Sequence, residues 1–297
     1  MVSNMLAVPA ESGDFSRYLF QQSEGNPFFV AEYIRAAVEE GMLHRNQQGT
    51  WLVGTTHRKA DDRIEYQKLP VPKSLKDLVS RRLEGLQPSS RSVLKVAAVV
   101  GREVRIVLLR NVVELTETSF MEAIEELLRR SLVEESEPEV IRFEHDKIRE
   151  VAYELLNSSE RTQCHLLIAR KIEKLWSSDL APYYKEIAYH YDHAKDKEKA
   201  VKYYTLAAHY AQNQHAHADA ISYFSRALEL IPPHEKTNRF NLLINREDVF
   251  HTLGDRAKQK QNLAALQELV ESLKEKSLQT KLLIAQSRYA EVIGSIK

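Results

Sequence analysis

The stretch AVKYYTLAAHYAQNQHAHADAISYFSRALELI, residues 200–231, decides the fold class of this chain. It contains two segments, twenty residues apart, in which small alanines and aromatic rings recur at positions 0, 3, 4, 7, 8 and 11. That spacing places each set on one face of an α-helix. The two sets are Ala200, Tyr203, Tyr204, Ala207, Ala208 and Ala211, and then Ala220, Tyr223, Phe224, Ala227, Leu228 and Ile231. We predict two neighbouring helices that approach closely at the alanines.

The second of these helices resembles the tetratricopeptide repeat, because Ala220, Phe224, Ala227 and Pro232 match the alanine, aromatic, alanine and proline signature of that repeat. Further helices are predicted at 236–253, 256–274 and 278–293. Residues 179–297 are therefore predicted to form a TPR-like α-solenoid. Its aromatic residues Tyr203, Tyr204, Tyr223 and Phe224 are interpreted as core, with anchors of a peptide groove as the alternative.

Charge and cysteine content exclude several classes of protein. Lysine plus arginine and aspartate plus glutamate both number 42, so the formal charge is zero and no whole-chain attraction to nucleic acid or anionic membrane is expected. The single cysteine, Cys164, excludes an internal disulfide and fits a reducing cytoplasm. No run of eighteen apolar residues exists, and residues 1–10 lack the basic region of a signal peptide. We expect a mainly α cytoplasmic protein.

Upstream of the repeats, the pattern predicts two further zones, residues 1–73 and residues 74–178. In the first zone, Asn26 suits an N-cap and Pro27 suits the first position of a helix reaching about residue 40. Short β-like runs follow at 42–44 and 50–53. The second zone reads as helices at 88–100, 105–113 and 118–130, then strands at 131–135 and 140–143, then helices at 145–156 and 159–176. A small β-hairpin that closes a three-helix unit is the arrangement of a winged helix.

Motifs for catalysis and metal binding are absent from the sequence or weak in it. The sequence contains no Walker A loop, no G-x-G-x-x-G, no H-E-x-x-H and no G-x-S-x-G. Cys164 and His165 are neighbours on a helix and point about 100° apart, which makes them a poor nucleophile and base. His190 and His193 share a helix face, and His215 and His217 flank a turn, but no third ligand is placed by pattern. We expect no enzyme activity and no metal site in this chain.

Duplex DNA is a weak candidate partner. The helix that would enter the major groove carries Glu117, Glu122, Glu125 and Glu126 against Arg129 and Arg130, a balance that repels phosphates. Arg102 and Arg105 are the nearby basic residues that could support binding to DNA.

Several motifs, in order between residues 24 and 150, resemble the STAND class of signalling ATPases, as found in predicted ATPases fused to bacterial kinases, nucleotide cyclases and LuxR-type regulators. They are EGNPFF at 24–29, LP at 69–70, RRLEGL at 81–86, VAAVVG at 96–101 and RFEHDKIRE at 142–150. The resemblance covers nearly the whole chain. It implies a helical lid over 1–73, a winged-helix domain with linking helices over 74–178, and a repeat-built sensor over 179–297.

The resemblance also implies a nucleotide site. In that class the Gly-x-Pro element, here Gly25, Asn26 and Pro27, places a proline against adenine. The winged-helix histidine, here His145, contacts the β-phosphate of the nucleotide in the resting state. Glu144 precedes it where the class has methionine. A histidine at a helix start suits an anion, since its N–H and the helix amides both donate. The alternatives are that Gly25–Pro27 is a plain helix start and that His145 is a plain cap.

The Walker A and Walker B segments of the class lie upstream of the lid, and this sequence begins inside the lid. The resemblance therefore implies ATP or ADP with magnesium as the cofactor of the intact family member, and no cofactor in this chain alone. The leading hypothesis is a non-catalytic regulatory and sensor fragment, whose partners are the ATPase core, an output domain and a protein or peptide on the repeats. A stand-alone repeat scaffold is the runner-up, and a DNA-binding protein comes third.

Overall fold

The computed structural model describes residues 13–23, 25–39, 43–45, 51–53, 79–80 and 82–294. The chain is mainly helical, as predicted, with two small antiparallel sheets in the described residues. It divides into two compact units, Met1–Ile106 with Leu115–Leu155 and Val107–Glu114 with Leu156–Lys297. The motif at 69–70 lies outside the described residues.

In the first unit, α2 (Gly13–Ser23) and α3 (Pro27–Glu39) pack against each other and are followed by a short hairpin of β1 (Leu43–Arg45) and β2 (Trp51–Val53). The predicted start of α3 at Pro27 is confirmed, and so are the two β-like runs. Phe15, Leu19, Tyr33, Ala37 and Leu43 are fully buried, which gives this small region a core of its own.

The next elements are α5 (Pro88–Val100), β3 (Glu103–Arg105), α6 (Ile106–Val112), α7 (Glu117–Arg129), β4 (Val133–Glu137), β5 (Val140–Phe143) and α8 (Asp146–Glu154). The sheet order is β3-β5-β4, with Val104 opposite Ile141 and Val133 opposite Phe143. These four side chains are buried, together with the apolar faces of α5 and α7.

One part of this region was predicted incorrectly. The pattern favoured a helix from residue 105, whereas 103–105 form strand β3 and the helix begins at Ile106. The segment is extended because Val104 pairs with β5, which lies far along the chain, and a local pattern does not register such pairing.

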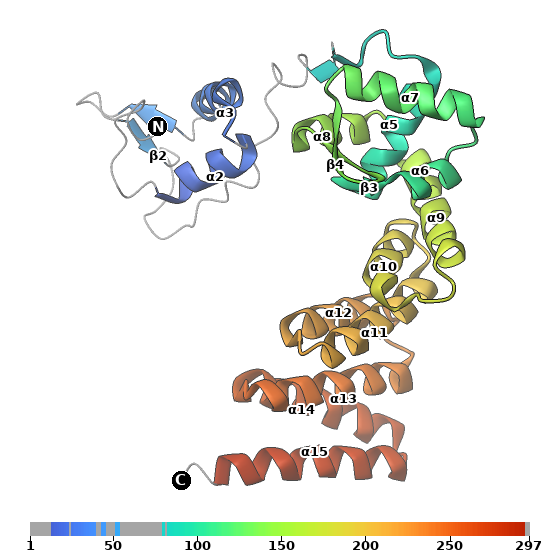
Figure 1. Ribbon diagram of the computed structural model, residues 1–297. Helices are drawn as coiled ribbons and strands as arrows, with labels where there is room; N and C mark the ends of the chain where they lie inside the picture. Colours follow the sequence, from blue (N-terminus) through green and yellow to red (C-terminus); the bar gives the residue numbers. More distant parts are fainter. Residues whose placement is uncertain are drawn as a thin grey trace. The chain divides into compact units, whose positions relative to one another are not determined.

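The second unit contains α9 (Ser158–Leu175), the short η3 (Ala181–Tyr183) and a row of antiparallel neighbours, α10 (Tyr184–His193), α11 (Lys197–Asn213), α12 (His217–Leu230), α13 (Lys236–Leu253), α14 (Arg256–Leu273) and α15 (Lys276–Gly294). Each helix of the row packs on the next, as Figure 1 shows from yellow to red. The TPR-like solenoid is confirmed as a helical-repeat fold.

The alanine and aromatic positions behave largely as the sequence indicates. All six predicted positions of α11 are buried, and Ala220, Phe224 and Ala227 of α12 are fully buried. Tyr203, Tyr204 and Phe224 are therefore core residues and not groove anchors. Tyr223 is the exception, because it is only half-buried.

Candidate functional site

Gly25, Asn26 and Pro27 form the turn between α2 and α3. Gly25 has φ +78°, a left-handed conformation that favours glycine, and its N–H donates to Ser23 Oγ at 3.3 Å. The Asn26 N–H donates to the Ser23 carbonyl at 2.9 Å, and the Asn26 carbonyl accepts from Val30 N–H at 3.0 Å. Pro27 is exposed at the first position of α3. The turn therefore presents a rigid, accessible proline.

His145 lies two residues after the end of β5 and immediately before α8, with an extended backbone and a half-buried ring. Within the described first turn of α8, its side chain makes no capping hydrogen bond. The ring instead meets Phe29 of α3 edge-on, with the centroids 5.1 Å apart. The start of α3 and the start of α8 are thus in contact, which brings His145 close to the segment that follows Pro27.

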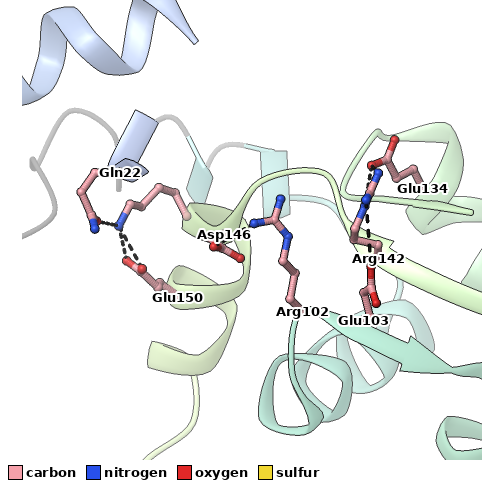
Figure 2. Close-up of polar contacts among 8 residues, drawn as sticks. Gln22, Arg102, Glu103, Glu134, Arg142, Asp146 and Glu150 are labelled. Carbon is pink, nitrogen blue, oxygen red and sulfur yellow. Dashed lines mark hydrogen bonds and ion pairs between the residues drawn. The ribbon is translucent and has the colours of Figure 1, made fainter. Parts of the chain in front are cut away.

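Lys147 of α8 also contacts the region of α2 and α3. This role of Lys147 was not predicted from the sequence. Its side chain is 5% exposed, and its Nζ donates to Gln22 of α2 at 2.8 Å and to both carboxylate oxygens of Glu150 at 2.9 Å. In Figure 2 dashed lines join Gln22 and Glu150 to one unlabelled side chain, which is that of Lys147. The Nζ also lies 5.4 Å from the centre of the Tyr33 ring. The i, i+3 spacing of Lys147 and Glu150 was visible in the sequence, but the partners from α2 and α3 were not.

Two tyrosines, one on α2 and one on α3, are held neutral at this junction. Burial raises the pKa of Tyr18 to about 12, with the neighbouring Tyr33 as the next contribution, and burial also raises the pKa of Tyr33. The Lys147 ammonium therefore lies beside the Tyr33 ring and the Glu150 carboxylate.

Arginines lie beside the start of α8 but are engaged with carboxylates. Arg102 contacts Asp146, the first residue of α8, at 3.1 Å, and Arg142 contacts Glu134 at 2.7 Å (Figure 2). An anion that approached the α8 amides would meet the Arg102 guanidinium and would compete with Asp146 for it. Both side chains of the Arg102–Asp146 pair are more than a third exposed, so replacing Asp146 by another anion costs Arg102 little free energy.

The charges of α7 need one correction. Glu126 was placed with the exposed acids, but it is buried and accepts hydrogen bonds from Ser90 Oγ at 2.5 Å and from Gln87 N–H at 3.2 Å. The Ser90 hydrogen bond is the main reason that its pKa is lowered. Arg130 is also structural, since it donates to the Glu84 and Gly85 carbonyls at the end of the preceding helical turn.

The Cys164–His165 neighbours show features opposite to those of a catalytic pair. Burial raises the pKa of Cys164 to about 11, which disfavours the thiolate. The Nδ1 of His165 lies 2.8 Å from the Nδ1 of His190, so its hydrogen-bond partner comes from α10. Burial lowers the pKa of His165 to about 4 and that of His190 to about 3. Among the described residues no group of three His, Cys, Asp or Glu is arranged to hold a metal ion.

A groove of about 620 Å³, here named the repeat groove, lies between α11, the end of α12 and α13. Asn238, Asn241 and Asn245 line it from one face of α13, at i, i+3 and i+7. Its apolar lining is Val201, Leu230, Ile231, Pro232 and Leu242, and its charged lining is Lys197, Glu198, Lys202 and Glu235. A volume of this size is ordinary for a ligand site.

Comparison with known proteins adds little. No protein-family profile matches the chain, and no curated protein matches it. Among solved structures, it is similar to a signal transduction ATPase with numerous domains (STAND) protein with a tetratricopeptide repeat sensor from Pyrococcus horikoshii. The identity is 12% and the TM-score is 0.38, and the match covers 92% of this chain and 41% of that protein. No residue role follows from a similarity at this level. No helix among the described residues has the length and apolar character needed to cross a bilayer.

Proposed function

We propose that this chain is a regulatory and sensor part of a STAND-type signalling ATPase, without catalytic activity of its own and acting in the cytoplasm. The ordered motifs from EGNPFF to RFEHDKIRE support this proposal. The observation that carries it is the contact between Phe29 and His145, because it joins the two segments to which the motifs assign nucleotide contacts. In this proposal residues 74–178 are the winged-helix domain with its linking helices, and they include His145.

The residues at this junction fit half of a nucleotide site. Pro27 offers an exposed, rigid apolar surface for a base, and His145 offers an N–H donor beside the backbone amides at the start of α8. Bound ADP would supply the negative charge that these donors recognise. Lys147 positions both segments, since it binds α2 and belongs to α8.

The decisive experiment is to sequence the DNA immediately upstream of the Met1 codon. Walker A and Walker B segments in frame with it would support the proposal. A stop codon followed by a ribosome-binding site would remove the nucleotide roles of Gly25, Asn26, Pro27 and His145, and would leave a stand-alone interaction protein.

In a longer protein that carries those segments, replacing His145 by Ala should speed ADP release and raise basal signalling, because the phosphate loses a donor of the closed state. The control is His234→Ala, an exposed histidine of the repeats. Unchanged ADP release and unchanged basal output in His145→Ala would contradict the assignment.

The second candidate function is a scaffold that binds an extended peptide in the repeat groove. The supporting observation is the row of amides on α13. Asn241 and Asn245 are four residues apart on the helix, about 6 Å along its axis, which is close to the ~6.7 Å that two residues of an extended chain span. Side-chain amides both donate and accept, as peptide backbone groups require.

Selection of the chain against a random peptide library would test the scaffold function. Enriched peptides should lose affinity for Asn241→Ala and keep it for Asn213→Ala, which lies outside the groove. Equal loss in the two variants would argue against this groove.

A further inference from the structure

The second unit contains another cavity, here named the tyrosine pocket, of about 230 Å³ between η3, the start of α10, α11 and α12. Its aromatic walls are Tyr184, Tyr210 and Tyr223, all half-buried, and half of the remaining lining is alanine. The two charged side chains on its lining are Lys185 and Asp219. It shares no lining residue with the repeat groove.

Two of the three rings of this pocket, those of Tyr184 and Tyr223, pack against buried tyrosines. The ring centroid of Tyr184 lies 6.0 Å from that of Tyr203, whose hydroxyl donates to Glu173. Tyr223 is stacked on Tyr204 at 6.3 Å, and the Tyr204 hydroxyl donates to Asp192 at 3.4 Å. The supporting rings belong to the buried core, so the walls are set before any ligand arrives.

Both charges of the pocket are available to a ligand. Lys185 and Asp219 make no ion pair or hydrogen bond with any part of the chain that the structure describes. Aromatic faces carry negative potential, so three tyrosines and one aspartate favour a cation. A plain cation would leave Lys185 uncompensated. A ligand with a cationic end and an anionic end satisfies both side chains.

The volume of the tyrosine pocket and the hydrogen-bonding needs of a ligand narrow the choice of ligand. A volume of 230 Å³ corresponds to about eight water molecules in the liquid, and hence to a ligand of roughly eight non-hydrogen atoms. A primary ammonium group needs three acceptors, whereas a methylated ammonium group has no N–H to satisfy and gains from contact with rings. Alanine and tyrosine walls suit the methylated group.

We propose that the tyrosine pocket binds a small zwitterion of the betaine class, with its quaternary ammonium against Tyr184, Tyr210, Tyr223 and Asp219 and its carboxylate toward Lys185. This site goes beyond the nucleotide-linked function and does not depend on it, because every residue involved lies in the repeats. It gives the helical-repeat region a small-molecule ligand.

Calorimetric titration of the full chain with glycine betaine tests the proposal directly. We expect saturable binding to one site. The matched control ligand is 3,3-dimethylbutyrate, which has the same shape with an uncharged carbon in place of nitrogen, and it should bind about tenfold more weakly or worse. No saturable betaine binding, equal affinity for dimethylbutyrate, or tighter binding of unmethylated glycine would each overturn the proposal.

Two variants separate the charges. Asp219→Asn should weaken both betaine and tetramethylammonium about three- to tenfold, whereas Lys185→Gln should weaken betaine and leave tetramethylammonium unchanged. The control is Glu198→Gln, because Glu198 also lies in the first turn of its helix but outside this pocket. Equal affinities of Asp219→Asn and Glu198→Gln for betaine would contradict the site. Tyr210→Leu, which keeps apolar bulk, should also weaken betaine and provides the same test if Asp219→Asn fails to fold.

Discussion

At the scale of single residues, Lys147 is a buried cation whose contacts connect α2, α3 and α8. A buried charge is costly unless its partners are kept, so the contacts of Lys147 determine whether α2 and α3 stay against α8. The Phe29–His145 contact depends on the same arrangement.

Replacing Lys147 by Met should loosen the α2–α3 region by about 1–3 kcal/mol, because the aliphatic stem is retained while the ammonium contacts are lost. Hydrogen exchange should show faster exchange of the α2 and α3 amides and unchanged exchange in α11 to α13. Lys174→Met, on an exposed position of α9, is the control. Unchanged exchange in α2 and α3 would show that Lys147 does not hold them.

His165 and His190 form a second buried polar contact that makes stability depend on pH. Their pKa values of about 4 and about 3 lie below the ordinary value of 6.5, mainly because burial disfavours the charged ring. The unfolded chain therefore binds more protons than the folded chain between pH 6.5 and pH 4. Stability contributed by the neutral pair is complete above pH 6.5 and is lost as the pH falls through that window.

We expect the free energy of unfolding to fall by about 2–3 kcal/mol or more between pH 6.5 and pH 4.5 through these two groups. Urea unfolding at both pH values should show a smaller fall in His165→Gln and in His190→Gln than in the parent chain. His234→Gln, at an exposed position, should leave the fall unchanged. If the free energy of unfolding falls with pH as much in all three variants as in the parent chain, the His165–His190 pair does not control that fall.

At the scale of elements, the turns after α10, α11 and α14 each use a left-handed residue that is not glycine, whereas the turn after α13 uses Gly254. After α11, His215 has φ +58°, its N–H donates to the Gln212 carbonyl at 3.0 Å, and the Ala216 N–H donates to the Ala211 carbonyl at 2.9 Å. This is the geometry in which helices usually place glycine.

His215→Gly should therefore stabilise the chain by about 0.5–1 kcal/mol, measured as a higher midpoint of thermal unfolding. The control is Gln214→Gly one residue earlier, where φ is −89° and glycine should destabilise by a similar amount. A lower midpoint for His215→Gly would show that its side chain matters more than its backbone.

The individual elements differ in how well the sequence predicts them. The helices at 236–253 and 256–274 were predicted to within one residue, because the apolar period and the caps are local signals. Strand β3 was missed because Val104 depends on a partner in β5. The Lys147–Gln22 contact joins residues 125 positions apart, and the His165–His190 contact joins residues 25 apart. The predicted roles of Gly25, Asn26, Pro27 and His145 stay predictions.

At the scale of the whole molecule, two compact units divide the chain, and the predicted domain boundaries at 73/74 and 178/179 stay predictions. The second unit is built almost wholly from contacts between consecutive helices. Stability in such an array is close to a sum of neighbouring terms, so damage to one helix pair is expected to spread only to its neighbours.

The pairing of β3 with β5 has a consequence for how the chain folds. Each repeat helix can pack as soon as its neighbour has formed, which is a low contact order and favours rapid folding. The strand at Val104 must wait until Ile141 is present, which requires closure of a much longer loop. Pulse-labelled hydrogen exchange during refolding should therefore protect the amides of α11 to α13 before that of Val104. During synthesis on the ribosome, β3 and β5 emerge before the repeat helices. The slowly forming sheet of the first unit therefore has time to close before the rapidly folding repeats emerge.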